Sequence, residues 1–266
     1  MIVMLFLLSC GDLDGPLSKP VLEWSPVPGG TTLIGAKALH PEEGPPTRTV
    51  VKSVQMSVTE VQNADFARFV DATGHVTSAE RGTLGKPAGS WVFFPPTTIR
   101  GTQQPGSWQF VLGATWRHPE GPGSDWKDRP TAPVVHVSHA DARAFAAWMG
   151  ARLPTEAEWE HAARRGATPG NVWQGGFPTL NTAEDGHEGT APAKAFAPSD
   201  DGIYDLLGNV WEWTADRAPD KPGARWAKGG SFLCDDSFCA RARPEARLAQ
   251  GEMETTNHLG FRVVKD

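Results

Sequence analysis

Apolar side chains recur at helical spacing within residues 60–72, where Phe66, Phe69 and Val70 fall on one face of the predicted helix. Gly74 follows this segment and predicts where the helix ends, because glycine readily adopts the left-handed conformation that stops a helix. We therefore expect an amphipathic helix whose apolar face packs onto a core, as part of the scaffold.

Two further helices are predicted by the residues at their ends. Ser138 can cap the start of a helix that runs to Met149, and Gly150 supplies a left-handed stop. The next helix is expected to begin after Thr155, which forms a capping-box pattern with Glu158. Both helices are interpreted as scaffold, and their acidic residues as caps and hydrogen-bond anchors.

The remaining regular structure is predicted to consist of short strands separated by turns. Alternating apolar residues favour strands at 134–138 and 261–264, and shorter strand pieces are expected within 210–216 and 227–232. The chain contains 29 glycines, 23 prolines and 11 tryptophans but one tyrosine, a composition in which indoles pack against irregular backbone. The fold class is therefore α+β, with little regular secondary structure.

The N-terminus resembles a lipoprotein signal. Residues 1–9 are continuously apolar and lead into Cys10, and the sequence LLSC matches a bacterial lipobox. We predict a signal segment over 1–9, a lipidated Cys10 with a Pro- and Gly-rich tether over 10–30, and one folded domain over 31–266. The apolar run is too short to span a bilayer, so attachment to a membrane would use only the lipid on Cys10. The alternative is a disordered or buried hydrophobic N-terminus.

This signal predicts a lipoprotein of the bacterial cell envelope, facing the periplasm or exposed at the surface. If the segment is not a signal, the expected location is the cytoplasm. The 266 residues carry a net charge of −6 with both signs mixed along the chain, so no basic face for nucleic acid is expected.

Cys234 and Cys239 form a close pair near the C-terminus, and Cys10 is the one other cysteine. Two thiols at this spacing can form a short-loop disulfide or hold a soft metal ion such as Cu(I). Zinc is disfavoured, because a tetrahedral site needs more ligands and no histidine lies close in sequence.

Four segments carry a resemblance to a known family: RLPTEAEWEHAARRG at 152–166, GNVWEWTAD at 208–216, KGGSFLC at 228–234 and LGFRVV at 259–264. In order and wording they resemble the formylglycine-generating enzymes, also called sulfatase-modifying factors. The resemblance extends from about Thr31 to Val264. It implies the formylglycine-generating-enzyme fold, which is related to C-type lectins.

The resemblance also implies a chemistry for the cysteine pair. In the family, Cu(I) held by the residues matching Cys234 and Cys239 activates O₂, and Ser231 matches a serine that lines the active-site pocket. The expected partner is an unfolded sulfatase, or another polypeptide with a Cys-x-Pro-x-Arg segment, whose cysteine becomes formylglycine.

Two structural calcium sites are implied as well, formed by oxygen atoms of the long loops between the third helix and GNVWEW. The first site would comprise Asn171, Val172, Asp185 and His187, and the second Asp205, Gly208, Val210 and Glu212. Carboxylates and carbonyls suit Ca²⁺, although Asp and Asn in such loops also form turns by bonding their own backbone. Asp205 replaces the usual Asn of the family.

Several positions depart from the family pattern near the expected peptide groove: Asp235, Phe238, Leu248 and His258. These changes put substrate choice in question. His136 and His139 would face opposite sides of a strand and are interpreted as structural. The His-x₃-His-x-Glu triad of iron-dependent sulfoxide synthases on a related fold does not occur in the sequence.

An alternative function remains on the sequence alone. The same scaffold would serve as a non-catalytic binding module on a surface lipoprotein, with Cys234 and Cys239 joined as a disulfide. A third interpretation is an oxidase that acts on a protein other than a sulfatase.

Overall fold

The computed structural model of the protein describes residues 18–83, 85–99, 102–235 and 240–266. The described residues form the helices α1 (Asn63–Thr73), α2 (Ser78–Arg81), α3 (His139–Met149) and α4 (Glu156–Ala163), with 3₁₀ turns η1 (Pro41–Glu43) and η2 (Trp126–Asp128). Short strands and long irregular loops account for the rest, so the structure confirms a mixed α and β fold with little regular secondary structure.

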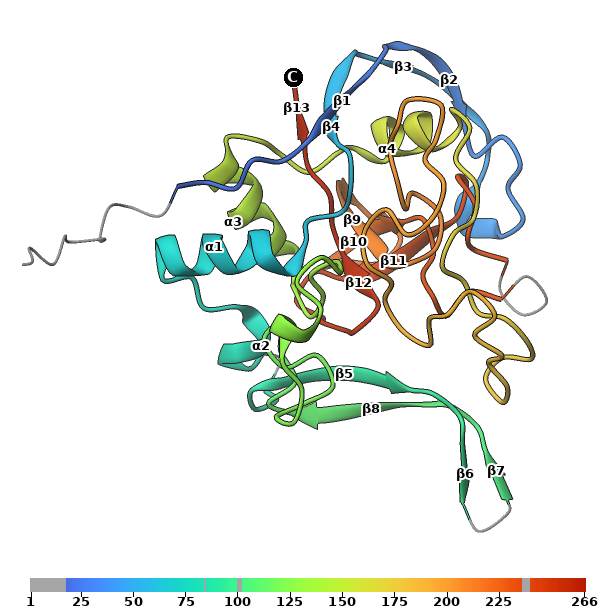
Figure 1. Ribbon diagram of the computed structural model, residues 1–266. Helices are drawn as coiled ribbons and strands as arrows, with labels where there is room; N and C mark the ends of the chain where they lie inside the picture. Colours follow the sequence, from blue (N-terminus) through green and yellow to red (C-terminus); the bar gives the residue numbers. More distant parts are fainter. Residues whose placement is uncertain (1–17, 84, 100–101, 236–239) are drawn as a thin grey trace, which may run out of the picture.

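A four-stranded sheet lies at the centre of the fold, in the order β11 (Arg247–Gly251), β10 (Ala224–Lys228), β9 (Trp211–Arg217) and β12 (Leu259–Gly260). A second sheet contains β1 (Trp24–Val27), β4 (Val54–Ser57) and β13 (Val264–Lys265). Three hairpins complete the strands: β2 (Gly30–Ile34) with β3 (Thr47–Val51), β5 (Gly89–Phe94) with β8 (Ser107–Leu112), and β6 (Thr97–Ile99) with β7 (Thr102–Gln104). Figure 1 shows the β5–β8 hairpin along one side of the body, with β6 and β7 at its far end.

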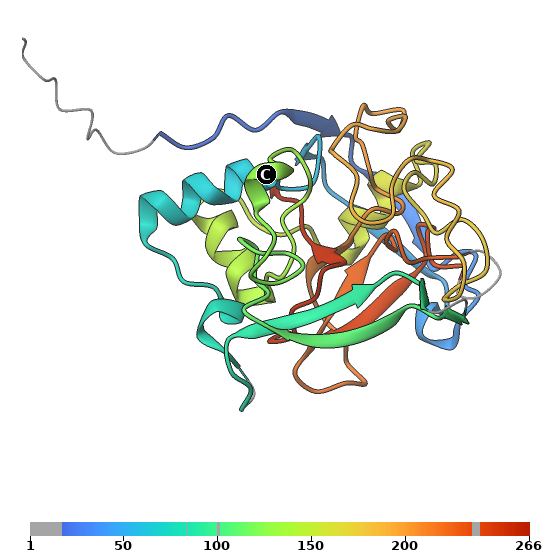
Figure 2. The ribbon, with the colours of Figure 1, turned by 60° about the horizontal axis from the view of Figure 1, so that its bottom comes forward.

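Aromatic rings form the core between the helices and the central sheet. Phe66 of α1 stacks on Phe145 of α3 with ring centroids 5.9 Å apart, and both rings meet the edge of Phe261. Trp116 packs edge-on against Phe66 and, like Trp213 of β9, is fully buried. The view in Figure 2 shows α1 and α3 side by side at one end of the molecule. Trp211 and Trp213 of β9 and Cys234 belong to the same core cluster, so the core extends to the turn that follows β10.

The capped helices agree with the sequence. Ser138 and Thr155 each accept a hydrogen bond from the backbone of the residue three positions on, and Gly150 adopts φ 70° at the end of α3. Helix α1 begins at Asn63, a little later than predicted, and Gly74 ends it with φ 66°. These capping and stop signals depend on residues close in sequence, so tertiary packing seldom overrides them.

The predicted strand at 134–138 is wrong. Its backbone bonds to loops instead of a ladder: Val134 N–H donates to the Val61 carbonyl and His136 N–H to the Thr256 carbonyl. His136 also has φ 61°, which breaks the extended conformation. The predictions at 261–264 and 227–232 hold only in part. Of the first range only Val264 belongs to a strand, β13, and in the second range strand β10 ends at Lys228.

The segment predicted as a tether contains strand β1. Trp24–Val27 pairs with β4 in antiparallel register, and the side chain of Val27 is fully buried. The folded part of the chain therefore reaches back beyond Thr31. Cys10 and residues 1–9 lie outside the described residues. Among the described residues, no helix has the length and apolar character needed to cross a membrane.

Candidate active site

A tight turn after β10 positions the thiol of Cys234. Gly229 and Gly230 follow the strand with positive φ, and a Cβ on Gly230 would meet the Arg241 carbonyl oxygen at 2.8 Å, so a side chain does not fit there. The Ser231 N–H donates to Cys234 Sγ at 3.3 Å, and the Cys234 N–H returns a bond to the Ser231 carbonyl at 2.9 Å. Both side chains are buried. The turn therefore fixes the thiol relative to Ser231.

Cys234 and Ser231 line one cavity of about 280 Å³. The other lining residues come from distant parts of the chain: Trp108, Phe177, Trp211, Leu233, Arg241, Leu248 and His258. Most of these side chains are apolar or aromatic, and Arg241 carries the only charge that is fixed at neutral pH. Such a cavity can hold a single substrate side chain and exclude much of the water around it.

His258 is a neutral polar group in this cavity. Its Nδ1 lies 2.6 Å from Thr256 Oγ1, and its ring packs edge-on against Trp108 with centroids 4.8 Å apart. Burial lowers the pKa of His258 to about 3. His258 and Leu248 both line the cavity.

Asp235 has a different role from the one expected. Its side chain is buried, and its Oδ2 accepts a hydrogen bond from the Phe177 N–H at 3.3 Å. Asp235 thus fastens the loop that brings Phe177 to the cavity and is not itself among the lining residues. Cys239 and Phe238 lie outside the described residues.

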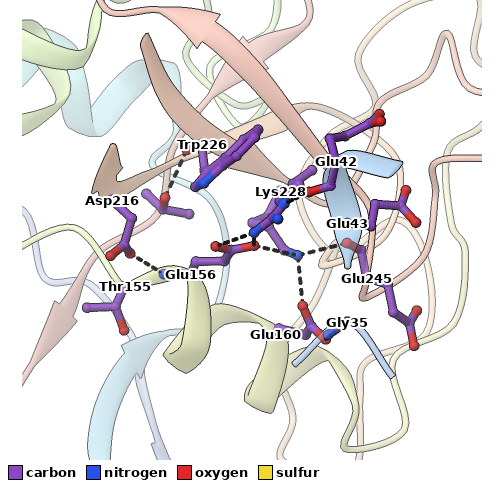
Figure 3. Close-up of polar contacts among 12 residues, drawn as sticks. Gly35, Glu42, Glu43, Thr155, Glu156, Glu160, Asp216, Trp226, Lys228 and Glu245 are labelled. Carbon is purple, nitrogen blue, oxygen red and sulfur yellow. Dashed lines mark hydrogen bonds and ion pairs between the residues drawn. The ribbon is translucent and has the colours of Figure 1, made fainter. Parts of the chain in front are cut away.

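Arginine ion pairs anchor the segment 241–243 to η1. Arg241 Nη2 lies 2.7 Å from Glu42 Oε1, and Arg243 forms a close ion pair with Glu43 of η1. Burial raises the pKa of Glu43, but the hydrogen bonds from Arg243 and from the backbone N–H groups of Leu39 and His40 outweigh it and hold the pKa below its usual value. Figure 3 shows Glu42 and Glu43 beside the buried cluster around Lys228.

The first predicted calcium loop contains unsatisfied oxygen atoms. Asn171 Oδ1 and Asp185 Oδ2 are buried without a hydrogen-bond partner. The backbone carbonyls of Val172 and His187 accept no hydrogen bond from any described residue. Buried oxygens are normally paired, and a hard cation would satisfy all four together. The residues present therefore fit a calcium site.

The second predicted loop shows the same feature, with one addition. Asp205 Oδ1 is buried without a partner, and so is Oε2 of Glu60, a residue that the sequence did not suggest. Burial and the nearby carboxylates of Asp205 and Glu212 raise the pKa of Glu60 well above its usual value. Glu212 differs, because Arg262 donates to both of its carboxylate oxygens, at 2.6 and 2.7 Å.

Asn209 connects these two loops. Its Nδ2 donates to Glu60 Oε1 at 3.0 Å, while its Oδ1 accepts from Asn171 Nδ2 at 3.0 Å. A Cβ on Gly208 would meet the Asn171 carbonyl oxygen at 2.4 Å, so only glycine permits this contact. Among the described residues, no group of three or more His, Cys, Asp or Glu side chains is placed to hold a metal ion. Each candidate instead combines carboxylates with amide and carbonyl oxygens.

Comparison with known proteins identifies the family. Residues 17–266 match the family described as the sulfatase-modifying factor enzyme 1-like domain. The chain belongs to this family. It is 43% identical over 90% of its length to the formylglycine-generating enzyme of Thermomonospora curvata, of which the match covers 92%. It is also 38% identical over 98% of its length to a Mus musculus protein named inactive Cα-formylglycine-generating enzyme 2, of which 91% is covered.

Solved structures show the sulfatase-modifying-factor fold. PvdO from Pseudomonas aeruginosa is 22% identical, with a TM-score of 0.63 over 91% of this chain and 93% of PvdO. CarF is 19% identical, with a TM-score of 0.56 over 92% of this chain and 98% of CarF. At these identities the likeness concerns the fold alone.

Two histidines outside the cavity around Cys234 form hydrogen bonds within the fold. His136 is fully buried, with Nδ1 2.8 Å from Ser90 Oγ and Nε2 2.8 Å from the Pro119 carbonyl oxygen. His139 is the first residue of α3, and its Nε2 lies 3.0 Å from the Thr214 carbonyl oxygen. The sequence predicted a structural role for both, although the strand on which that argument rested does not form.

Two residues of the site have no local signal in the sequence. Trp108 belongs to β8, and the hairpin pairing with β5 carries it to the cavity from more than a hundred positions before Cys234. Glu60 precedes α1 and meets the GNVWEW loop through Asn209. In both cases tertiary contacts alone bring the residue to the site.

Proposed function

We propose that the protein converts a cysteine of a substrate polypeptide to formylglycine. The observation that carries this proposal is the turn that fixes the Cys234 thiol beside Ser231 at the wall of a cavity of about 280 Å³. The high identity to a formylglycine-generating enzyme along nearly the whole chain supports the same activity.

We propose Cu(I) as the cofactor, held by Cys234 and Cys239. Thiolates are soft ligands that select Cu(I). Of the two thiols, Cys234 is described and lines the cavity. When bound, Cu(I) supplies the activation of O₂ that the protein's own side chains lack.

The overall reaction needs a reductant. A –CH₂SH side chain, O₂, two protons and two electrons give –CHO, H₂S and water, so an external thiol must supply the electrons. Ser231 and the neutral His258 provide the polar groups that orient the substrate cysteine, and the aromatic wall limits the access of water.

The proposed substrate is an extended, unfolded Cys-x-Pro-x-Arg segment of a sulfatase. Trp108, Phe177 and Leu248 offer apolar contacts next to the thiol, which suit the proline. Arg241 would repel the arginine of the substrate, so that side chain must point away from the cavity. The changes at Leu248 and His258 therefore act on the residues that flank the substrate cysteine.

Calcium is proposed at both loops. Asn171 and Asp185 would hold one ion with the carbonyls of Val172 and His187. For the second ion, Asp205 with the carbonyls of Gly208 and Val210 would be assisted by Glu212, and Glu60 is added to the set because its Oε2 is buried without a partner. The role of both ions would be to hold the long loops that frame the cavity.

The test is turnover of a peptide. Copper-loaded protein with O₂ and a thiol reductant is mixed with Cys-x-Pro-x-Arg peptides that vary in the flanking residues, and the aldehyde is detected by mass spectrometry. Conversion of at least one peptide, lost in Cys234→Ser, is the expected result. No conversion of any peptide by a sample shown to contain copper would exclude the activity.

A second candidate is a non-catalytic binding protein in which Cys234 and Cys239 form a disulfide. The similarity to a relative named inactive favours it. Thiol titration separates the two candidates, since the disulfide form yields no reactive thiol at these positions before reduction.

A lipid anchor at Cys10 is compatible with either candidate. It predicts that native protein fractionates with membranes of the cell envelope and that Cys10→Ala releases it.

A further inference from the structure

A second, larger cavity lies away from the candidate active site. It measures about 480 Å³ and is bounded by one face of α3, the segment 151–155 and residues of β9 and β10. Its lining residues are His139, Arg143, Ala146, Ala147, Ala151, Arg152, Leu153, Thr155, Ala215 and Arg225. None of these residues lines the cavity around Cys234. The proposed oxidation reaction therefore gives this cavity no role.

The charge of this cavity is opposite to that of the whole chain. Three arginines line it and no acidic residue does, whereas the protein carries a net charge of −6. The balancing acids sit outside: Glu158 and Asp266 pair with Arg152, and Glu252 pairs with Arg225. A cleft lined by one sign of charge concentrates ions of the other sign.

The arginines differ in the donors that they leave available. Arg152 uses its donors on Glu158, Asp266 and the Leu153 carbonyl. Arg225 donates through Nε to Glu252 and through Nη1 to the Ala215 carbonyl, which leaves Nη2 available. Arg143 is exposed and forms no hydrogen bond or ion pair with any described residue. One whole guanidinium and the edge of a second can therefore bind a ligand.

The rest of the lining is apolar and small. Ala146, Ala147, Ala151 and Leu153 line a hollow with few polar groups. Its size falls in the range typical of small-molecule sites, about 300–1,000 Å³. A dianion such as phosphate would lack the donors it needs here, but a single carboxylate matches the planar guanidinium of Arg143.

We propose that this cavity binds a small organic carboxylate with an apolar body, with Arg143 as the anchor for the carboxylate. Arg225 provides a second donor, and the alanine wall of α3 receives the apolar part of the ligand. The site is separate from the proposed oxidation reaction, so it stands whether or not that reaction occurs.

Octanoate is a suitable probe, with octylamine and 1-octanol as ligands of similar size and different charge. Isothermal titration calorimetry at neutral pH should show saturable binding of one octanoate per chain. Octylamine should not bind, and 1-octanol should bind at least about tenfold more weakly, because it lacks the charge-assisted hydrogen bonds.

Variants separate the site from non-specific binding. Arg143→Ala should weaken octanoate binding by about tenfold or more, whereas Arg68→Ala, which removes an exposed arginine from α1, should leave it unchanged. Ala147→Phe places a ring in the cavity from an exposed helix position and should abolish binding, with thermal melts used to confirm folding.

His139 lines the cavity, and burial together with the neighbouring Arg225 and Arg143 lowers the pKa of this histidine to about 4. A bound carboxylate should raise the pKa of His139. The imidazole resonances in an NMR titration report this change. The absence of saturable octanoate binding, or equal affinity in wild type and Arg143→Ala, would overturn the proposal.

Discussion

Lys228 Nζ lies 2.9 Å from Glu160 Oε2, and both side chains are fully buried. The pair joins α4 to the last residue of β10, directly before the glycine turn that leads to Cys234. Arg164 bridges Glu160 and Glu245 at 2.9 and 2.7 Å. Lys228 also donates to the Glu245 carbonyl, as Figure 3 shows. The network therefore holds both chain segments that frame the cysteine turn.

Lys228→Met is expected to reduce the free energy of unfolding by about 3 kcal/mol, because it leaves the buried Glu160 without one of its two cationic partners. Arg164 and the Gly35 N–H still reach Glu160, which limits the loss. Urea denaturation measures the change, and Lys52→Met at an exposed position serves as the control. A difference between the two variants below about 0.5 kcal/mol would mean that the pair adds no stability.

Cys234→Ser should remove both Cu(I) binding and peptide turnover, since one thiolate cannot replace the pair. Ser231→Ala should slow turnover while copper stays bound, because Ser231 lines the cavity and is not proposed as a ligand. Copper is measured by Cu(I) competition titration and turnover by mass spectrometry, with Cys10→Ser as the control. Equal copper binding in wild type and in the double Cys234→Ser, Cys239→Ser variant would contradict the proposed cofactor.

The parts of the molecule that the sequence predicts well depend on local chemistry. The caps of α3 and α4 need only residues within one turn, and both appear as predicted. The strand expected at 134–138 fails because the distant backbone of Val61 and Thr256 takes its hydrogen bonds. For the same reason nothing in the sequence points to Trp108 or Glu60. Their place in the site depends on hairpin pairing and loop contacts that span a large part of the chain.

Chelation should destabilise the protein if both loops hold calcium. Each ion present at about 100 times its dissociation constant adds about 2.7 kcal/mol, so EDTA should lower Tm by roughly 5–10 °C for each ion that it removes. Asp185→Ala and Asp205→Ala should each remove part of this shift, because each takes away a buried oxygen without another partner. Asp71→Ala, at an exposed position of α1, is the matched control. Identical EDTA shifts in all four proteins would show that the two acids only shape turns.

Glu60→Gln provides a separate test of the second loop. The carboxamide keeps the size of the side chain and can still accept the bond from Asn209, but it removes the charge that would bind a cation. In the presence of calcium we expect this variant to melt at a lower temperature than wild type, with a smaller further loss when EDTA is added. A wild-type response to EDTA would show that Glu60 takes no part in the site.

Acid should destabilise the protein through its buried histidines. Burial lowers the pKa of His136 from 6.5 to about 4, so the folded state binds fewer protons than the unfolded state between these values. The stability that this histidine contributes is present above pH 6.5 and is lost as the pH falls towards 4, at a cost of up to about 3 kcal/mol. Urea denaturation at several pH values should show a smaller loss in His136→Asn than in wild type. Equal slopes for the two proteins would place the acid sensitivity in other groups.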